Sequence, residues 1–500
     1  MKKILIYAMG CLLLMGVSSC KDFLEKYPYD SIPEDDTFNT ADEFREHWFG
    51  VYSSLKGAGG FTEACRVYGD IQCDLFQSVQ SNQGLLSSVY NWNFNASDPN
   101  TNSIYGAMWM TIGRVNRILD NYPKIKANAT DEDIEWMETY LGDLYFIRAY
   151  CYSELVKYYC EAYDPARAGE QLGMSIVKTL DHERNLPRAS LKDTYDFMLE
   201  DLEEAGKRIV RAVDLNTVAY EQNCVASTQA VLALKARLYL YMQDYPKASE
   251  TALKCWDACL AGQLFLANTA EYYDLLLEDG ITTEVIMRLA MTPVDVQGSI
   301  GSYFCMESAG KVRPEYIPSV AFLDMFEAND IRSNMFTRTR LGYQHGLEWE
   351  ICTKSGHSTE LDKSSYNPAY QSMPALFRMS ELALIIAEAN AANPNGDMSL
   401  ANDYMNQLKK ARIEKWDSKK YNAVDMLRVV KDERAKELCL EGFRLADLKR
   451  WHMGILRKPQ PYTNAPFNAL EIKADDPRFT WPIPQHEMDV NDKMEGNASN

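Results

Sequence analysis

Three glutamates near the C-terminus have the residue type and spacing of a possible catalytic site. Glu433, Glu437 and Glu441 recur at i, i+4 spacing, which places their carboxyl groups on one face of a helix. Such a set could supply a general acid and base to a hydrolase. A row of glutamates beside arginines is also typical of buried ion pairs between stacked helices, and Gly442 permits close packing there. We favour structural ion pairs involving Glu433, Glu437 and Arg444, and we predict no catalytic residue and no enzyme. The nearby arginines are Arg434, Arg444 and Arg450.

Alternating aromatic residues in the loop 57–95 have the pattern of a sugar platform. Tyr90, Trp92 and Phe94 alternate, and Asn95 supplies both a hydrogen-bond donor and an acceptor. A sugar ring has an apolar C–H face and a rim of hydroxyls, so aromatic rings with amide partners suit it. Packing against helices is the alternative for each aromatic. For Trp92 we expect ligand contact.

A second aromatic region lies within residues 282–373. This stretch is rich in Gly, Ser, Pro and Tyr and has no sustained hydrophobic period. Long irregular stretches inside a compact body are uncommon unless they are functional. We predict a loop-rich insertion whose aromatic side chains form a platform opposite the first loop, with packing again as the alternative. The candidates are Tyr303, Tyr343, Trp349 and Tyr366.

The N-terminus has the features of an export signal that ends in a lipid-attachment site. Two lysines precede an apolar run from Ile4 to Val17, which is too short to span a bilayer, and small residues lead to Cys20. Acyl chains on a mature N-terminal cysteine would anchor the protein to a membrane. We predict a signal peptide over 1–19 and a lipidated tether over 20–40. An ordinary signal peptide with an incidental cysteine is the alternative.

Composition indicates a globular body and argues against some partners. The 500 residues are 46% hydrophobic and 25% charged, with no further apolar run of membrane-spanning length. The formal net charge of -19 disfavours nucleic acid, because that binding needs clustered Lys and Arg. Tyr (30) outnumbers Phe (18) and Trp (9) together, and Tyr joins an apolar face to a polar tip. Such side chains suit sugar or peptide ligands.

Cysteine and histidine carry no clear metal signature. Cys255 and Cys259 lie one helical turn apart, but none of the six His falls nearby at ligand spacing. We expect buried free thiols at these positions. Phosphate-binding glycine loops, nucleophile elbows and EF-hand loops are missing from the sequence. The sequence therefore predicts no metal and no cofactor.

Helical periodicity dominates the chain, and strand alternation is scarce. Segments 228–260 and 380–412 each contain two helical patterns joined by a polar turn, with Ala at packing positions, and resemble tetratricopeptide hairpins. Each hairpin must stack on another to bury its apolar face. We predict an all-α, tetratricopeptide-like helical-repeat scaffold with an N-terminal region over 41–225 and a C-terminal region over 226–500. Helices are expected at 40–55, 104–121, 131–159, 191–210, 227–243, 245–260, 380–392, 400–416 and 424–451.

Several motifs recur in order along nearly the whole chain. They are an Asp-Phe-Leu-Glu run after Cys20, Trp109 with 116–119, the helix 143–150, the segment 186–190, the charged segments 433–444 and 447–451, and the Trp-Pro-Ile-Pro-Gln run 481–485. In this combination the chain resembles the SusD/RagB family, outer-membrane nutrient-binding lipoproteins of Bacteroidota. The spacing of Trp92 and Asn95 resembles an aromatic and amide pair used in that family. The segment 157–163 departs from the family pattern, so ligand contacts near it are not carried over.

The resemblance implies a fold, a partner and a place in the cell. The fold is an all-helical tetratricopeptide scaffold, and the partner is a SusC-like TonB-dependent transporter. The implied location is the extracellular face of the outer membrane, with attachment to its lipid through an acylated Cys20. The leading function is capture of an oligosaccharide for uptake. A peptide-binding RagB-type receptor and a non-enzymatic helical-repeat adaptor are the alternatives.

Overall fold

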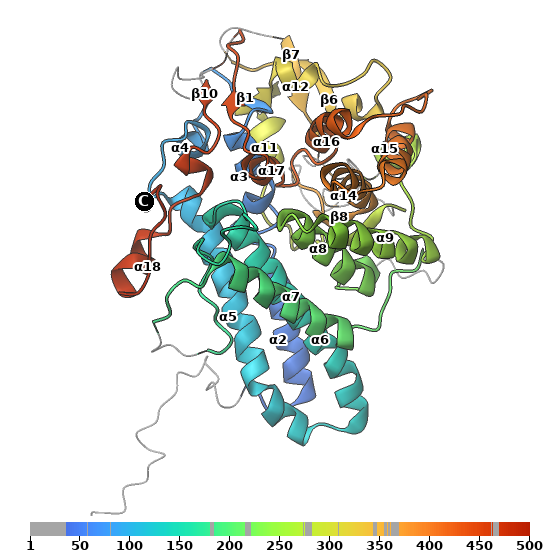
Figure 1. Cartoon of the computed structure of the whole chain (residues 1–500). Helices are drawn as coiled ribbons and strands as arrows, with labels where there is room; N and C mark the ends of the chain where they lie inside the picture. The colour runs from blue at the N-terminus through green and yellow to red at the C-terminus, as the bar shows by residue number, and fades with distance from the viewer. Residues whose placement is uncertain are drawn as a thin grey trace, which may run out of the picture.

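Helices form the body of the protein, and most of the short strands lie at the top of Figure 1, whereas β8 lies between the helices in the middle. This computed structural model confirms the predicted helical-repeat fold class. The longer helices are α2 (Ala41–Ser54), α3 (Ala64–Gln72), α5 (Pro99–Asn128), α6 (Asp131–Tyr159), α7 (Leu191–Arg208), α8 (Thr228–Tyr241), α9 (Tyr245–Ala261), α14 (Met379–Ala392), α15 (Met398–Arg412), α16 (Ala423–Glu437) and α17 (Arg444–Arg450). The shorter helices are α4 (Ser87–Tyr90), α10 (Thr269–Tyr273), α11 (Gly301–Phe304), α12 (Val320–Leu323), α18 (Gln485–Val490) and the 3-10 turns Gln222–Cys224, Ile331–Met335 and Pro477–Phe479.

The strands are short and pair only two by two within the described residues. They are β1 (Phe76–Ser78), β2 (Val285–Arg288), β3 (Glu307–Ser308), β4 (Lys311–Val312), β5 (Tyr316–Pro318), β6 (Phe336–Arg340), β7 (Glu348–Cys352), β8 (Ala375–Arg378), β9 (Ile455–Leu456) and β10 (Glu471–Ile472). The structure describes residues 37–500 except 58, 81, 181–184, 216–221, 274, 276–282, 309, 344–347, 355–357, 359–360, 362–369, 462 and 464–469. The predicted signal peptide, Cys20 and Tyr366 lie outside the described residues.

Capping residues visible in the sequence set most helix boundaries. Thr40 caps α2, and Glu43 at the third helical position bonds back to the cap backbone, which completes a capping box. Thr130 caps α6 in the same way, and the predicted helix 131–159 is confirmed at both ends. The prediction 104–121 is too short for α5, because Asp98 caps that helix well before residue 104.

Four helices, α2, α5, α6 and α7, form the lower half of the molecule in Figure 1. Arg148 of α6 ties three of them together: its guanidinium bonds to Asp201 of α7 at 2.7 Å and to Asn116 of α5 at 2.7 Å. Trp48 of α2 stacks on Tyr140 of α6 with 4.2 Å between ring centroids. Although α5 and α6 are long, no helix among the described residues is both long and apolar enough to cross a bilayer.

The two predicted hairpins are present as α8–α9 and α14–α15, which stack on one another. Small residues allow the close approach: Ala233 and Ala383 are almost fully buried. Polar links fix the stacking, because Arg237 of α8 pairs with Glu381 of α14 at 2.7 Å. The hairpins lie beside the upper ends of the N-terminal helices in Figure 1.

The predicted helix 424–451 is interrupted, which corrects that boundary. Helix α16 ends at Glu437, and α17 begins at Arg444. Leu440 (φ 58°) and Gly442 (φ 81°) take left-handed conformations between them. A Cβ at position 442 would collide with the backbone oxygen of Cys65, so glycine is needed there for close contact with α3.

The loop 57–95 is also more ordered than its composition predicts. It contains α3, every residue of which is buried, followed by β1 and α4. The insertion 282–373 contains β2 to β7 rather than structureless loop. Strand β1 pairs antiparallel with β5 of the insertion, so the two predicted regions are joined directly.

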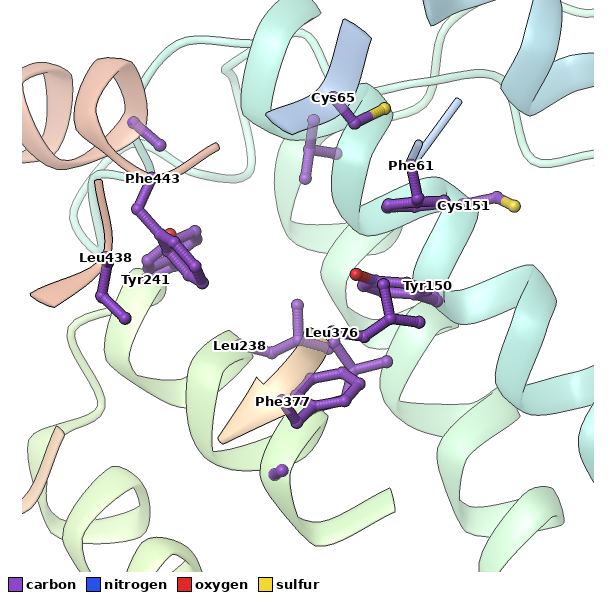
Figure 2. Packing of buried hydrophobic residues seen from close by; sticks show 14 of the residues in the cluster. Phe61, Cys65, Tyr150, Cys151, Leu238, Tyr241, Leu376, Phe377, Leu438 and Phe443 are labelled. Atoms are coloured by element: carbon purple, nitrogen blue, oxygen red, sulfur yellow. The ribbon is translucent and has the colours of Figure 1, made fainter. Parts of the chain in front are cut away.

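One large hydrophobic core links the helical layers (Figure 2). Tyr150 of α6 lies at its centre, stacked on Phe61 at 4.5 Å and close to Phe377 of β8 at 5.5 Å between ring centroids. In Figure 2, Leu238 of α8 lies near Phe377. The core therefore joins the N-terminal helices to the first hairpin, which makes a rigid support for the strands above it.

Candidate functional site

The structure brings the two predicted loop regions together at one surface. Besides the β1–β5 pairing, the backbone N–H groups of Gln83, Gly84 and Leu85 donate to the carboxylate of Glu315 at 3.1, 3.0 and 3.1 Å. Tyr316 donates its hydroxyl to the backbone oxygen of Leu85. We call the region formed by residues 82–85, 312–318, 341–343 and 348–351 the loop face; Glu315, Tyr316 and Ile317 are buried beneath it. Glu315 thus joins the two loop regions, and nothing in its local sequence predicts this role.

Trp92 lies in the core, against the prediction that it contacts ligand. Its side chain is 2% exposed, and its indole N–H donates to the backbone oxygen of Gln72 at 2.8 Å. The ring meets Phe479 edge-on, with 4.9 Å between centroids. The cause is local: Trp92 follows α4 with a φ of 55°, so the chain reverses there and the indole points inward.

Tyr90 and Phe94 are buried as well, so the alternating aromatics do not form a platform. The Tyr90 ring lies under the guanidinium of Arg457, 3.9 Å from the ring centroid. Arg457 also donates to four backbone oxygens, among them those of Cys73 and Tyr90. Phe94 packs near Trp481 at 6.1 Å between centroids. Arg457 therefore supplies donors to the carbonyl groups at the end of α3.

Asn95 and Tyr303 have different surroundings. Asn95 is exposed, and its side-chain oxygen accepts the backbone N–H of Ser97 at 2.9 Å, which closes a local turn. Tyr303 is buried and donates to the carboxylate of Glu63 at 2.6 Å. Burial raises the pKa of Tyr303 far above its ordinary value, and the nearby Tyr68 and Glu63 add to that rise. Tyr303 is therefore a core residue and not a ligand platform.

Tyr343 and Trp349 are the two predicted aromatics that keep part of their surface exposed on the loop face. Both are half-buried, and both pack on a small cluster made by Val79, Ile317, Leu341 and Ile351. The Tyr343 hydroxyl donates to the backbone oxygen of Pro314 at 2.5 Å, and burial raises the pKa of Tyr343. The indole N–H of Trp349 lies 3.5 Å from the backbone oxygen of Pro318. The Tyr343 ring is held by its hydroxyl, and both rings are held by packing on the apolar cluster.

An ion pair of the β6–β7 hairpin lies on the face opposite Trp349, because successive side chains of a strand point to opposite faces. Trp349 lies in β7 opposite Thr339 of β6. One residue further along the hairpin, Arg338 and Glu350 form an exposed ion pair at 2.8 Å. The ion pair therefore does not border the exposed surface of the Trp349 ring.

The glutamate row forms ion pairs inside the protein. Glu437 is fully buried and receives hydrogen bonds from Arg332, Arg378 and Arg412 at 3.2, 2.9 and 3.0 Å. Glu433 pairs with Lys409 at 2.6 Å. We call this set the buried charge network. Its members are Glu284, Asp330, Arg332, Lys354, Arg378, Lys409, Arg412, Glu433, Lys436, Glu437 and Glu441.

Electrostatics in this network favours the ionised state of its carboxylates. Although burial opposes charge on Glu437, the surrounding guanidinium groups hold its pKa well below the ordinary value. Glu433 is shifted in the same direction, by Arg332, Lys436 and Lys409, against its own burial. Both carboxylates lack solvent access and are paired with fixed cations, so the arrangement serves as an internal tie between the insertion and the helices.

The arginines nearest to the glutamate row in sequence pair elsewhere. Arg444 bonds to Asp74 at 2.7 Å, and Arg434 bonds to Asp447 at 2.7 Å. The cations that do meet Glu437 come from the insertion, from β8 and from α15, far away along the chain. Cys255, a candidate free thiol, donates to the backbone oxygen of Gln229 at 3.2 Å. Among the described residues, no group of three or more His, Cys, Asp or Glu is arranged to hold a metal ion.

Family models match both parts of the chain. The model of the SusD family matches residues 349–499, and a second model, described as starch-binding and associating with the outer membrane, matches residues 22–240. Two SusD-like proteins of Formosa agariphila are 23% and 21% identical to this chain. The alignments cover 97% and 98% of this chain and 97% of each relative.

Solved structures share the fold. A SusD superfamily protein of Bacteroides thetaiotaomicron superposes with a TM-score of 0.78 at 20% identity, over 92% of this chain and 99% of that one. A SusD-like carbohydrate binding protein of Bacteroides vulgatus gives a TM-score of 0.74 at 19% identity, over 91% and 98% of the two chains. Two family models, full-length relatives and a common fold agree. The chain belongs to the SusD family.

Proposed function

We propose that this protein is a non-enzymatic surface receptor that captures an oligosaccharide on the loop face. The observation that carries the proposal is the pair Tyr343 and Trp349, two half-buried rings that pack on one apolar cluster where the first loop meets the insertion. A fixed aromatic surface loses little conformational entropy on binding, which favours its use as a platform.

The relatives support a sugar ligand over other classes. The second family model is described as starch-binding, and one structural neighbour is a carbohydrate binding protein. The net charge of -19 makes polyanionic ligands unfavourable. The alternative is a peptide ligand, as for a RagB-type receptor, and the binding experiment must exclude it.

The experiment is binding of the mature chain to a glycan array, with a pool of random peptides as the competing ligand class. We expect retention of one class of neutral oligosaccharide and no enrichment from the peptide pool. Enrichment of peptides without glycan binding would reassign the protein to the peptide-binding branch, and no binding of either would favour the adaptor alternative.

We further propose that Cys20 carries acyl chains, which hold the protein to the outer membrane, and that a SusC-like TonB-dependent transporter receives the ligand. The small residues that lead to Cys20 support the lipid anchor. The description of the second family model supports the location at the outer membrane. A tethered binder cannot itself move a solute across a membrane, so a channel must take the ligand over. Such a complex should bury more than about 2,000 Å², as permanent assemblies do.

Two preparations test these two points separately. Cys20→Ala should release the protein from the detergent-soluble envelope fraction while leaving its fold unchanged. Affinity purification through a C-terminal tag in mild detergent should recover a barrel protein with the wild-type chain. Recovery of the chain alone, under conditions that keep envelope complexes intact, would contradict the transporter partnership.

A further inference from the structure

A groove of about 770 Å³ runs along the outer face of α15, beside the segment 418–421 that follows this helix. In Figure 1, α15 lies at the right of the molecule, and the loop-face strand β7 lies at the top. The lining of the groove lies within residues 398–421, every one of which the structure describes, and shares no residue with the loop face. The volume falls within the range of about 300–1,000 Å³ that is typical of small-molecule sites.

Two asparagines one helical turn apart on α15 fix the floor of this groove. The side chain of Asn402 donates to the backbone oxygen of Tyr421 at 3.0 Å and accepts the backbone N–H of the same residue at 2.7 Å. Asn406 makes the same two bonds with Lys419, at 2.8 and 2.9 Å. The indole of Trp416 donates to the side-chain oxygen of Asn406 at 3.0 Å, and the Lys419 ammonium lies 4.5 Å from the centroid of that indole. The segment 418–421 is therefore fixed against α15, and the groove is preformed.

The rim differs from the floor, because its polar side chains are exposed and have no partner within the protein. Among the described residues, six of these side chains make no hydrogen bond and no ion pair, which leaves them available to a ligand. They are Ser399, Asp403, Gln407, Lys410, Ser418 and Lys420.

The charge of the lining is opposite in sign to that of the whole chain. Lys410, Lys419 and Lys420 bring three ammonium groups, and Asp403 brings the single carboxylate of the described lining. The chain as a whole carries a formal net charge of -19. At physiological ionic strength, exposed charges more than about 8 Å apart are largely screened, so the lysines at the groove outweigh the acidic remainder of the protein. The acidic residues next to the lining but outside it are Asp397 and Asp417.

This chemistry selects among ligand classes. Ammonium groups form charge-assisted hydrogen bonds with a carboxylate or a sulfate. Asp403 accepts hydrogen bonds, so it suits a ligand that also carries hydroxyl donors. Met398 and Tyr421 are half-buried in the lining and offer apolar surface to the C–H face of a sugar ring. An acidic sugar unit combines all three features, whereas a neutral sugar would leave the lysines without an anion.

We propose that the α15 groove is a second binding site, which takes an acidic saccharide, one whose ring carries a carboxylate or a sulfate group. The inference rests on the proposed function, since it assigns a further sugar unit to the same receptor. The groove and the loop face would recognise sugars of different charge, so that a glycan with both kinds of unit could be held at two points.

The probes are matched pairs of sugars that differ in charge. Trigalacturonic acid is compared with galactotriose, and cellotriuronic acid with cellotriose, each by isothermal titration. A κ-carrageenan tetrasaccharide tests sulfate in place of carboxylate. Triglutamate tests whether an acidic peptide serves equally well.

Three double variants separate the groove from the rest of the surface. Lys410→Ala with Lys420→Ala removes two exposed ammonium groups of the groove, and Lys410→Arg with Lys420→Arg keeps their charge. Lys192→Ala with Lys207→Ala removes the same charge from exposed ion pairs of α7 and is the matched control.

We expect at least one acidic saccharide to bind the wild type, and a uronic acid that binds to do so more tightly than its neutral partner. The alanine variant of the groove should weaken this binding about tenfold or more, because two charge-assisted contacts are lost. The arginine variant and the α7 control should bind as the wild type does. Raising the salt from about 0.05 M to about 0.5 M should weaken the acidic saccharide and not a neutral glycan on the loop face.

The possible failures are distinguishable. If no acidic saccharide binds the wild type, or if the groove and α7 alanine variants bind it equally, the groove site is overturned, while retention of a neutral glycan leaves the proposed function intact. Binding of triglutamate as tight as that of the uronic acids would overturn the assignment to saccharides. Loss of all glycan binding in the wild type would instead overturn the proposed function.

Discussion

The polar groups of the buried charge network and those of the loop face have different surroundings. In the network, charged side chains from distant segments meet one another, and Glu437 has no exposed surface left. On the loop face, Tyr343 and Trp349 pack one part of each ring on an apolar cluster and leave the rest exposed. The more conspicuous sequence motif is thus the structural one. The difference teaches that exposure, and not residue type, separates an internal tie from the proposed binding surface.

The largest effect is expected in the network. Glu437→Ala would leave the guanidinium groups of Arg332, Arg378 and Arg412 without their shared carboxylate, so it should lower the free energy of unfolding by about 3–5 kcal/mol. Chemical denaturation monitored by circular dichroism measures this. Glu250→Ala, which removes an exposed pair with Lys254, is the control and should change little. Equal stability of the two variants would contradict a structural role for the network.

The second largest loss of stability is expected at a buried aromatic residue. Trp92→Ala should destabilise the fold by about 3–5 kcal/mol, because a buried indole and its hydrogen bond to Gln72 are lost together. Thermal unfolding in parallel with Trp349→Ala sharpens the comparison, since Trp349 is only half-buried and should cost clearly less. A melting temperature for Trp92→Ala close to that of wild type would mean that the indole is not part of the core in solution.

Acid should weaken the network progressively. The pKa values of Glu433, Glu437 and Glu441 lie below the ordinary 4.5 in the folded protein. The unfolded chain therefore binds these protons more readily, so the stabilisation is present above about pH 4.5 and is lost as the pH falls below it. Denaturation midpoints between pH 7 and pH 3 measure the loss. The Glu437→Ala variant should show a shallower fall than wild type, and an identical slope would place the acid-sensitive groups elsewhere.

Much of the helical scaffold is predictable from local signals. Thr40, Thr130 and Ser227 mark helix starts because each side chain accepts a backbone N–H of the first turn, a short-range event. The hairpins follow from small residues at regular spacing, which is also local. The break at Gly442 is harder to predict from the sequence, because it depends on the close approach of Cys65 from a segment far away in the chain.

The candidate site is less predictable for the same reason. The alternation at Tyr90, Trp92 and Phe94 indicates aromatics near a turn but not which way that turn faces, and the left-handed φ of Trp92 decides it. Likewise the glutamate row predicts ion pairs, while its partners Arg332 and Arg378 depend on tertiary packing of the insertion. Side-chain direction in irregular segments is set by contacts that no local pattern encodes.

The most direct test of the account is isothermal titration of the best glycan from the array into Trp349→Ala and Trp416→Ala. Trp416 is also half-buried but lies beside Asn406 of α15, away from the loop face, so it controls for loss of an aromatic ring. We expect Trp349→Ala to weaken binding by about 1–3 kcal/mol, as loss of an anchor residue does, and Trp416→Ala to bind like wild type. Unchanged affinity in Trp349→Ala, with the glycan still bound, would contradict the claim that the loop face is the platform.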